Sequence, residues 1–212
     1  MREVTTGQVT RLAGREELRF TSCVIRFALW SGLLACAACA TDEQPFVDNT
    51  TPSERSRVFY LRNGTLGKIV DSSETRAGVD IADADCTASA RDRGFDGVLR
   101  AWLSSSTVDA ITRLDDAAPW YRTDRETLLF ATKAELVEGP RATIEPSSDG
   151  ELMFWSGTSL DGTRTSHTCA DWTIYNVPAV ATVGRADAAH SAWVVDEPLL
   201  CSNYLALLCI EQ

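Results

Sequence analysis

The sequence predicts an α+β domain, because helix signals come early in the chain and short strands come late. Hydrophobic residues make up 44% of the 212 residues, which is enough to bury a core and argues against global disorder. Four of the seven cysteines lie well beyond an export signal, and they imply two disulfides that staple this domain.

The first and longest helix is expected over about Asp83–Arg93. The segment is rich in Ala, has Asp in its first turn and is followed by Gly94. Asp80, Asp83 and Asp85 resemble a metal-binding cluster only superficially, because no Asp-x-Asp-x-Asp-Gly calcium loop is present. We interpret them as capping residues at the start of the helix.

Two short helices are expected after this long one. Ser106–Asp109 has the pattern of a capping box and predicts a helix that continues to about Leu114. Thr132–Glu135 repeats the pattern and predicts a helix that ends near Gly139.

Strands are predicted where β-prone or apolar runs lie between turn signals. The expected strands are Val58–Leu61, Val98–Leu103, Leu152–Ser156, Trp172–Tyr175 and Tyr204–Ile210. The expected turns are Asn63-Gly64, Ser148-Asp149-Gly150, Asp161-Gly162 and Gly184. The sequence contains no internal repeat.

The N-terminal segment is predicted to be a signal peptide over residues 1–35, because the apolar run Phe27–Ala35 is too short to span a membrane. It ends in Leu33-Leu34-Ala35-Cys36, which resembles the lipobox of bacterial lipoproteins. The resemblance implies that Cys36 is lipidated and anchors the mature chain to a membrane of the cell envelope. Cys39 is the weaker candidate, because no large apolar residue lies three positions before it. The alternative is a buried helix that contains both cysteines.

The rest of the chain is expected to divide into two parts. Residues 36–56 are polar, contain Pro and have no apolar period, so we expect a lipidated N-terminus and a flexible tether. Residues 57–212 are expected to form the domain.

The charge distribution restricts the partners of this domain. The formal net charge is −10, although residues 1–35 carry five Arg against three Glu. The body is therefore more acidic than the whole chain, which argues against nucleic acid, heparin or anionic lipid as its partner.

The cysteine pattern allows more than one set of disulfides. Cys23 leaves with the signal peptide, and Cys36 and Cys39 belong to the N-terminal segment. The cysteines that remain are Cys86, Cys169, Cys201 and Cys209. Four cysteines can pair in three ways, and their spacing does not choose among them.

Sequence blocks around these cysteines resemble endostatin, the globular C-terminal fragment of certain basement-membrane collagens. The block from Gly94 to Ser105 resembles its Gly-Leu-x-Gly-x-Phe-Arg-Ala-Phe-Leu-Ser-Ser stretch. The other similar blocks are Glu126–Phe130 with Ala134–Gly139, Phe154–Arg164 with Cys169–Trp172, and Cys201-x7-Cys209-Ile210-Glu211. In this order they cover about Ala82 to Gln212, nearly the whole predicted domain.

The resemblance implies a C-type-lectin-like fold, in which a mixed, twisted sheet is combined with an early long helix and two short helices. It also implies two nested disulfides, Cys86–Cys209 and Cys169–Cys201. The outer bridge would then join the first helix to the last strand and close most of the domain into one loop.

The metal and polyanion sites of these families do not carry over. Endostatin binds zinc through an N-terminal His cluster, whereas the mature chain has only His167 and His190, without partners at ligand spacing. The motifs nearest to a lectin calcium site, Glu145-Pro146-Ser147 and Glu197-Pro198-Leu199, lack the amide or carboxylate that should follow Pro. Endostatin is basic and binds heparin, and this body is acidic. We therefore expect no metal and no heparin binding.

The predicted domain contains no recognisable catalytic constellation. Ser156 lies in Trp-Ser-Gly and not in a Gly-x-Ser-x-Gly elbow, and His167 lies in a polar segment typical of an exposed loop. The acidic pairs Asp115-Asp116 and Asp196-Glu197 are expected in solvated loops, since acidic residues are abundant. We expect neither enzyme activity nor a cofactor.

Together these patterns predict a membrane-anchored binding or adhesion module, whose ligand is an unidentified protein or glycan. Trp120-Tyr121 offers rings that stack on a ligand, although such pairs are more often half-buried in strands. The alternatives are a structural envelope lipoprotein without a soluble ligand and, less favoured, a hydrolase. An exposed aromatic patch would favour a binding module, and a flat polar surface would favour a structural role. A deep pocket that contains an acid or a His with a shifted pKa would favour an enzyme.

Overall fold

The computed structural model describes residues 46–51, 54–70, 77–146 and 152–212, except for the side chains of 59–63 and 195–197. The expected signal peptide, Cys36, Cys39 and the turn at 148–150 lie outside the described residues. Within the described ranges, no helix has the length and apolar character needed to cross a membrane.

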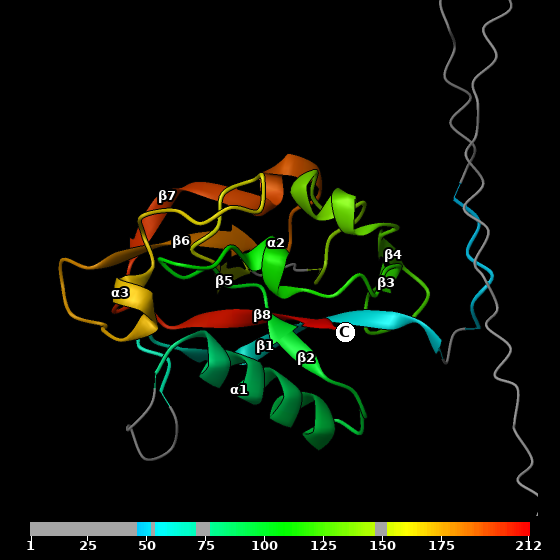
Figure 1. Ribbon diagram of the computed structural model, residues 1–212, viewed down its shortest axis with the longest axis horizontal. Helices are drawn as coiled ribbons and strands as arrows, with labels where there is room; N and C mark the ends of the chain where they lie inside the picture. Colours follow the sequence, from blue (N-terminus) through cyan, green and yellow to red (C-terminus); the bar gives the residue numbers. More distant parts are fainter. Residues whose placement is uncertain (1–45, 52–53, 71–76, 147–151) are drawn as a thin grey trace, which may run out of the picture. The chain divides into compact units, whose positions relative to one another are not determined.

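The described strands form one mixed sheet (Figure 1). Their order is β4-β3-β1-β8-β5-β6-β7, and β2 also pairs with β8. The pairs β1–β3 and β5–β8 are parallel, and the other pairs are antiparallel. The bounds are β1 Ser56–Thr65, β2 Leu99–Ala101, β3 Trp120–Tyr121, β4 Leu128–Phe130, β5 Met153–Trp155, β6 Val180–Arg185, β7 Val194–Leu200 and β8 Leu205–Glu211. The expected α+β class with a mixed sheet is confirmed.

One long helix and several short ones accompany this sheet in the described part of the chain. Helix α1 begins four residues earlier than predicted and is followed by short α2 and α3 and the 3₁₀ helices η2 and η3. The bounds are α1 Val79–Asp92, α2 Ala110–Arg113, η2 Lys133–Val137, α3 Cys169–Trp172 and η3 His190–Trp193. The two predicted short helices correspond to α2 and η2.

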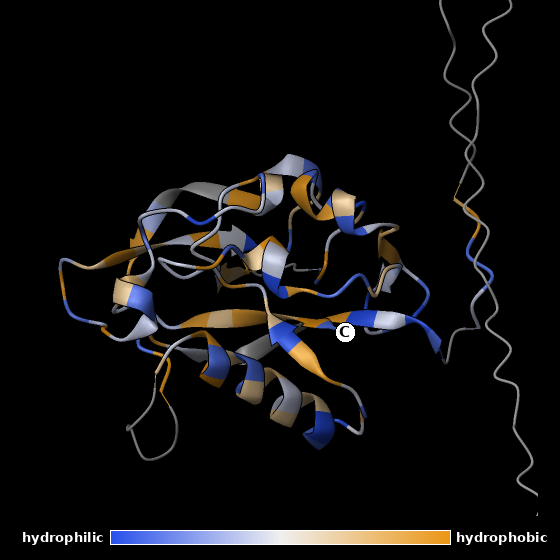
Figure 2. Ribbon diagram, viewed as in Figure 1, coloured by the Kyte–Doolittle hydropathy of each residue, from blue (hydrophilic) through white to orange (hydrophobic). Residues whose placement is uncertain are grey.

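Strand β8 lies at the centre of the sheet and is buried on both faces, which explains its continuous apolar run (Figure 2). Leu207 and Cys209 face a cluster that includes the buried side of α1. The alternate residues Ala206, Leu208 and Ile210 face a second cluster, which contains Trp102, Trp120 and Trp193. This alternation is the two-residue period of a strand.

Two buried disulfides tie the elements around β8 together. Cys86 of α1 is bonded to Cys209 of β8, and Cys169 of α3 is bonded to Cys201 in the turn before β8. These are the two pairs that the resemblance implies. The outer bridge spans 123 residues and the inner one 32.

Asp83 is not a helix-capping residue, contrary to the prediction. Its carboxylate accepts hydrogen bonds from the Ala101 backbone N–H at 2.8 Å and from Arg113 Nη2 at 2.7 Å. Gly78 is the N-cap residue of α1, and no side chain caps the helix there. Asp83 is therefore a tertiary link, which joins α1 to β2 and to the side chain at the end of α2.

The two predicted capping boxes are also wrong in detail. Helix α2 begins after Asp109, and the Ser104 hydroxyl, not Ser106, accepts from the Ala110 N–H at 2.9 Å. At η2, the Thr132 side chain makes no capping bond. There Glu135 accepts instead from the N–H of Ala131, the residue before the N-cap, at 2.9 Å.

Two predicted turns are absent and one is confirmed. Strand β1 runs through Asn63-Gly64 with a shift of register against β8 between Leu61 and Thr65. Gly184 lies within β6, where a Cβ would come within 2.2 Å of the Phe154 ring, so this glycine serves close packing. Asp161-Gly162 does form a turn, in which the Gly162 N–H donates to Ser159 O at 3.0 Å.

Residues expected in the tether contact the domain ahead of the predicted boundary at Arg57. The Tyr121 hydroxyl donates a hydrogen bond to Asp48, and Arg55 pairs with Asp48 at 3.0 Å. The Arg55 guanidinium lies over the Tyr121 ring and also donates to Arg125 O at 2.9 Å. The segment that contains Asp48 and Arg55 is thus attached to β3.

The link between Asp48 and Tyr121 has a consequence for titration. Burial, the hydrogen bond to Asp48 and the charge of Asp48 together raise the pKa of Tyr121 to about 12. The hydrogen bonds from Tyr121 and the Thr50 N–H lower the pKa of Asp48 to about 2. The stability that Asp48 contributes is thus fully present above pH 3.8 and is lost as the pH falls through about 2. The stability that Tyr121 contributes is present below pH 10 and is lost as the pH rises through about 12.

We predict that Asp48→Asn lowers the pKa of Tyr121 from about 12 towards its ordinary value of 10. The shift is partial, because burial of the ring remains. Ultraviolet absorbance of the phenolate during an alkaline titration measures it, with Tyr121→Phe assigning the signal. Asp116→Asn removes an exposed charge elsewhere and leaves the titration unchanged; an equal shift in that variant would contradict the prediction.

Candidate ligand-binding groove

The segment predicted as strand Trp172–Tyr175 begins instead inside a left-handed turn. The four residues Cys169, Ala170, Asp171 and Trp172 have φ angles of 49°, 51°, 58° and 65°. This conformation costs an L-residue roughly 1–2 kcal/mol. Four such residues in a row require strong tertiary restraint, and backbone of this kind is concentrated at functional sites.

Side chains and the inner disulfide supply that restraint. The buried Trp172 ring donates from Nε1 to Ser104 O at 2.8 Å. Asp171 accepts from the N–H and the hydroxyl of Ser106 at 2.5 and 2.6 Å. With Cys169 bonded to Cys201, the turn is attached both to the segment after β2 and to the turn before β8.

The same framework holds the chain that follows β1. The Gly67 N–H donates to Cys201 O at 2.8 Å, and the Ile69 N–H donates to Trp172 O at 2.9 Å. A Cβ at Gly67 would lie 2.3 Å from Cys169 Sγ, so only glycine allows this approach to the disulfide. The inner disulfide therefore positions the segment after β1, the left-handed turn and the turn before β8 together.

Two exposed tyrosines project from this framework and line a hollow of about 380 Å³. Tyr204 is 71% exposed and Tyr175 is 44% exposed. A Cβ at Gly64 would lie 3.0 Å from Tyr204 Cδ1, so the ring rests close to the β1 backbone. We call this space the tyrosine hollow; it is lined by Thr65, Leu66, Lys68, Val70, Tyr175 and Tyr204.

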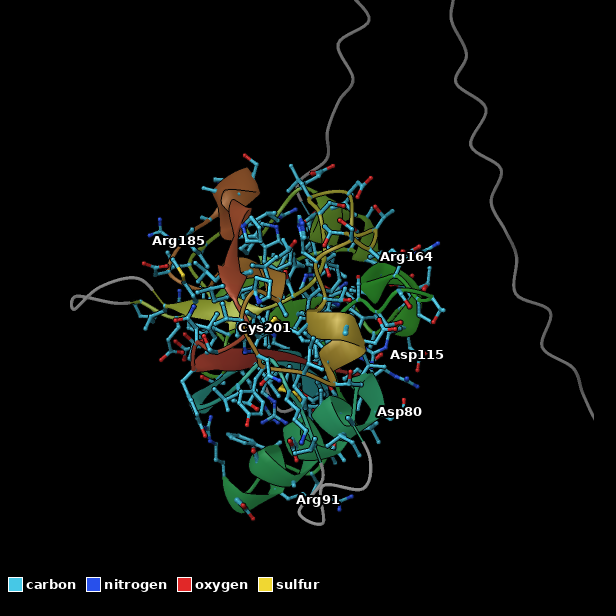
Figure 3. All side chains as sticks on the ribbon, turned by 90° about the vertical axis from the view of Figure 1, so that its left-hand side faces the viewer. Asp80, Arg91, Asp115, Arg164, Arg185 and Cys201 are labelled. Atoms are coloured by element: carbon cyan, nitrogen blue, oxygen red, sulfur yellow. A yellow bond between two sulfur atoms is a disulfide. The ribbon has the colours of Figure 1, made fainter. Side chains whose placement is uncertain are left out.

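Figure 3 looks onto the end of the domain that carries the inner disulfide. Cys201 lies near the middle of this view, and Asp80 and Arg91 on α1 lie towards the bottom. The labelled side chains of Arg164 and Arg185 lie at opposite sides of the view. Arg164 is paired with Asp109 at 3.0 Å, and Arg185 with Asp187 at 3.0 Å.

A second hollow of about 220 Å³ shares the lining residue Thr65 with the first. We call it the acidic hollow; it is lined by Gly64, Thr65, Asp85, Ala88, Ser89, Asp92 and Leu207. Its polar side chains Asp85, Ser89 and Asp92 have the spacing i, i+4, i+7 and therefore share one face of α1. We refer to the two hollows together as the groove.

The groove has different electrostatic character at its two ends. At the acidic end Asp85 is exposed, and partial loss of hydration raises the pKa of its carboxyl. Among the described residues, no hydrogen bond or ion pair reaches the carboxylate of Asp85 or Asp92. At the other end, Lys68 lies with Tyr175 and Tyr204. A ligand in the groove would thus meet carboxylates at one end and phenol rings with a lysine at the other.

The two carboxylates of the acidic hollow are spaced along α1. Asp85 and Asp92 are attached about 10 Å apart along the helix axis, at roughly 1.5 Å per residue. The paired carboxylates of glycoside hydrolases are roughly 5–9.5 Å apart, on either side of the scissile bond. No histidine lines either hollow.

The residues examined as candidates in the sequence lie outside the groove. Ser156 is buried and donates to Thr182 O at 3.2 Å, and His167 is exposed in a loop. Trp120 and Tyr121 form strand β3, as the strand interpretation predicts, but they are buried and present no surface to a ligand. In the described ranges, no three His, Cys, Asp or Glu residues are grouped so that they could hold a metal.

Sequence reasoning missed the residues that line the groove. The sequence predicts strands at Tyr175 and Tyr204, and it predicts that Asp85 caps a helix. The spacing of Asp85, Ser89 and Asp92 on one face of a helix is a signal that could have indicated a shared surface. No sequence signal placed that surface next to the two tyrosines.

Comparisons with known proteins do not assign this chain to a family. No protein-family model matches the sequence, and a search of curated proteins finds no match.

Proposed function

We propose that this protein is an exported lipoprotein, anchored to the cell envelope by a lipid at Cys36, whose domain binds a protein or glycan ligand in the groove. The observation that carries the proposal is the pair of exposed tyrosines, Tyr175 and Tyr204, at a hollow of about 380 Å³. Ligand sites are commonly hollows of roughly 300–1,000 Å³ with aromatic walls. Rigid tyrosines contribute contact area at low entropic cost.

The proposed fold family is endostatin-like, within the C-type-lectin-like class. Its support is the order of the matching sequence blocks, together with a mixed sheet and disulfides that pair Cys86 with Cys209 and Cys169 with Cys201. Fold likeness does not identify a ligand. The groove, rather than the fold family, therefore carries the functional proposal.

The proposal excludes heparin and nucleic acid as ligands, as the charge of the chain predicts. Polyanion binding requires several clustered cations that release counterions together. Arg113 and Arg100 both approach Asp83, and Arg164 is paired with Asp109. These arginines are distributed among acidic partners and do not form a basic patch.

We predict that Tyr204→Ala weakens ligand binding at least tenfold, because exposed aromatic residues at binding sites are frequent hot spots. The measurement is binding of the labelled protein to an array of synthetic peptides and oligosaccharides, followed by titration of each probe that gives a signal. Thermal unfolding is expected to change little, because Tyr204 is 71% exposed.

Phe46→Ala is the matched control, since it removes an exposed aromatic ring that does not line the groove. It should leave the signals unchanged. If Tyr204→Ala and Tyr175→Ala both bind every probe as the wild type does, the groove is not the ligand site.

Lipidation is tested in the producing cell. A palmitate analogue supplied during growth should label the wild type and fail to label Cys36→Ser, because acylation of the first mature residue requires its thiol. Cys39→Ser is the matched control and should remain labelled. Label on Cys36→Ser but not on Cys39→Ser would place the anchor at Cys39. Label on both variants would show that neither cysteine is by itself required for lipidation.

A further inference from the structure

An exposed apolar pair, Phe46 and Val47, lies ahead of β1 on the side of the domain that carries β3. Phe46 is 40% exposed and Val47 is 71% exposed. The next residue, Asp48, accepts hydrogen bonds from the Tyr121 hydroxyl of β3 and from Arg55 Nε at 3.0 Å. These bonds fix the chain directly after the apolar pair, so the pair has a defined place on the domain.

The apolar pair and the tyrosine hollow belong to opposite ends of β1. Ser56, the first residue of β1, is opposite Trp120 of β3, whereas Thr65, the last residue, lines the tyrosine hollow. A strand of 10 residues extends about 30 Å, at roughly 3.3 Å per residue. In Figure 1, residues 46–51 lie on the right, beyond β3 and β4, and α3 lies on the left. A partner that covers the apolar pair therefore leaves the tyrosine hollow open.

The sequence places the predicted lipid close to the apolar pair. Cys36 precedes Phe46 by ten residues, which reach at most about 36 Å at roughly 3.6 Å per residue. A lipid at Cys36 would hold the membrane within this distance of the pair and raise its effective concentration there. Two apolar side chains bind a membrane weakly by themselves, but they strengthen an attachment that a lipid has already made.

The charges at this end of the domain favour an apolar contact over an ionic one. Arg55 is paired with Asp48 at 3.0 Å, and Arg122 is paired with Asp124 at 3.8 Å. Because carboxylates already neutralise these arginines, they are poor partners for lipid phosphates. The formal net charge of −10 also opposes approach to an anionic surface. Insertion of apolar side chains requires no charged lipid.

We propose that Phe46 and Val47 enter the surface of the membrane that holds the Cys36 lipid, and that this second contact turns the tyrosine hollow away from that membrane. The inference rests on the lipid anchor of the proposed function and adds an orientation to it. Apolar and aromatic side chains are stabilised at the boundary between headgroups and acyl chains. The lipid and the apolar pair together hold the domain at two points, whereas the lipid alone would leave its orientation open.

Quenching of tryptophan fluorescence by brominated lipid tests the contact. The acylated protein, purified from the producing cell, is incorporated into vesicles of phosphatidylcholine whose acyl chains carry bromine, which quenches tryptophan on contact. The native tryptophans of the domain should remain unquenched, because each is 2% exposed or less: Trp102, Trp120, Trp155, Trp172 and Trp193. Phe46→Trp adds an emitter at the apolar pair. We expect brominated vesicles to remove about half or more of the added emission, relative to vesicles of unbrominated phosphatidylcholine.

Tyr204→Trp is the matched control, because it places an exposed tryptophan at the tyrosine hollow. Its added emission should be the same in both kinds of vesicle. Equal quenching of Phe46→Trp and Tyr204→Trp would show that the domain has no fixed orientation and would overturn the inference. Each variant exchanges one exposed aromatic ring for another, so thermal unfolding should match that of the wild type.

Flotation of the vesicles separates this inference from the lipid anchor itself. If the protein does not float with the vesicles, the lipid anchor of the proposed function fails, and the inference fails with it. If the protein floats but Phe46→Trp emits equally in both kinds of vesicle, the anchor stands and the membrane contact of the apolar pair is refuted. Added salt should leave the quenching of Phe46→Trp intact, since salt screens ionic contacts and not apolar ones. Loss of quenching in salt would contradict an apolar contact.

Discussion

Replacing both Cys86 and Cys209 with alanine is expected to cause the largest loss of stability in this protein. The bridge closes a loop of 123 residues, and constraint of the unfolded chain by such a loop is worth about 5 kcal/mol. This is close to the whole stability of many domains, at roughly 5–15 kcal/mol. Urea unfolding, followed by tryptophan fluorescence, should show a much lower midpoint concentration of urea, or no folded baseline at about 37 °C.

The inner bridge is the matched comparison for the outer one. It closes only 32 residues, for which the same relation gives about 4 kcal/mol. Breaking it also releases the left-handed backbone of Cys169–Trp172, which offsets part of the loss. The double alanine variant of Cys169 and Cys201 should therefore remain more stable than that of Cys86 and Cys209, and the opposite order would refute this account.

Arg57→Met is expected to cost about 3 kcal/mol, the second largest effect. Arg57 is 2% exposed, and it donates to Glu211 from its backbone N–H at 3.0 Å, from Nε at 2.9 Å and from Nη2 at 3.0 Å. Its guanidinium also lies over the Phe95 ring at 4.3 Å. Removing one partner of a buried ion pair leaves the other charge uncompensated, and such changes cost about 3–5 kcal/mol.

Two companion variants make this prediction specific. Arg164→Met breaks a pair whose arginine is 46% exposed, and it should cost less than about 1 kcal/mol. Arg57→Met combined with Glu211→Leu removes both charges and should recover much of the lost stability, because apolar replacement of a whole buried pair is often tolerated. Urea unfolding measures all three. Equal losses for Arg57→Met and Arg164→Met would show that burial of the pair is unimportant.

Several elements could be predicted because their signals are local. The apolar run of β8 arises because both faces of that strand are buried, and the Ala-rich pattern of α1 identified its helix to within four residues at the start. The turn Asp161-Gly162 follows from glycine at a positive φ of 79°. Each of these signals lies within a short stretch of neighbouring residues.

Other predictions failed because distant contacts outweighed local preference. Asp83 has the sequence context of a capping residue, but Arg113 and the Ala101 N–H attract its carboxylate. Asn63-Gly64 is a strong turn pair, yet pairing of β1 with β8 carries the strand through it.

The sequence by itself determined the α+β class, the acidic body and the presence of two disulfides in this domain, because composition, periodicity and cysteine number are properties of the chain. Only the tertiary structure brought Asp85 and Asp92 of α1 beside Thr65 of β1, and Thr65 beside Tyr175 and Tyr204. These residues come from four separate segments. The inner disulfide and the left-handed turn that it anchors position the two tyrosines, and the outer disulfide ties α1 to β8, the neighbour of β1. Neither the handedness of that turn nor the packing across the disulfides is encoded in a local pattern.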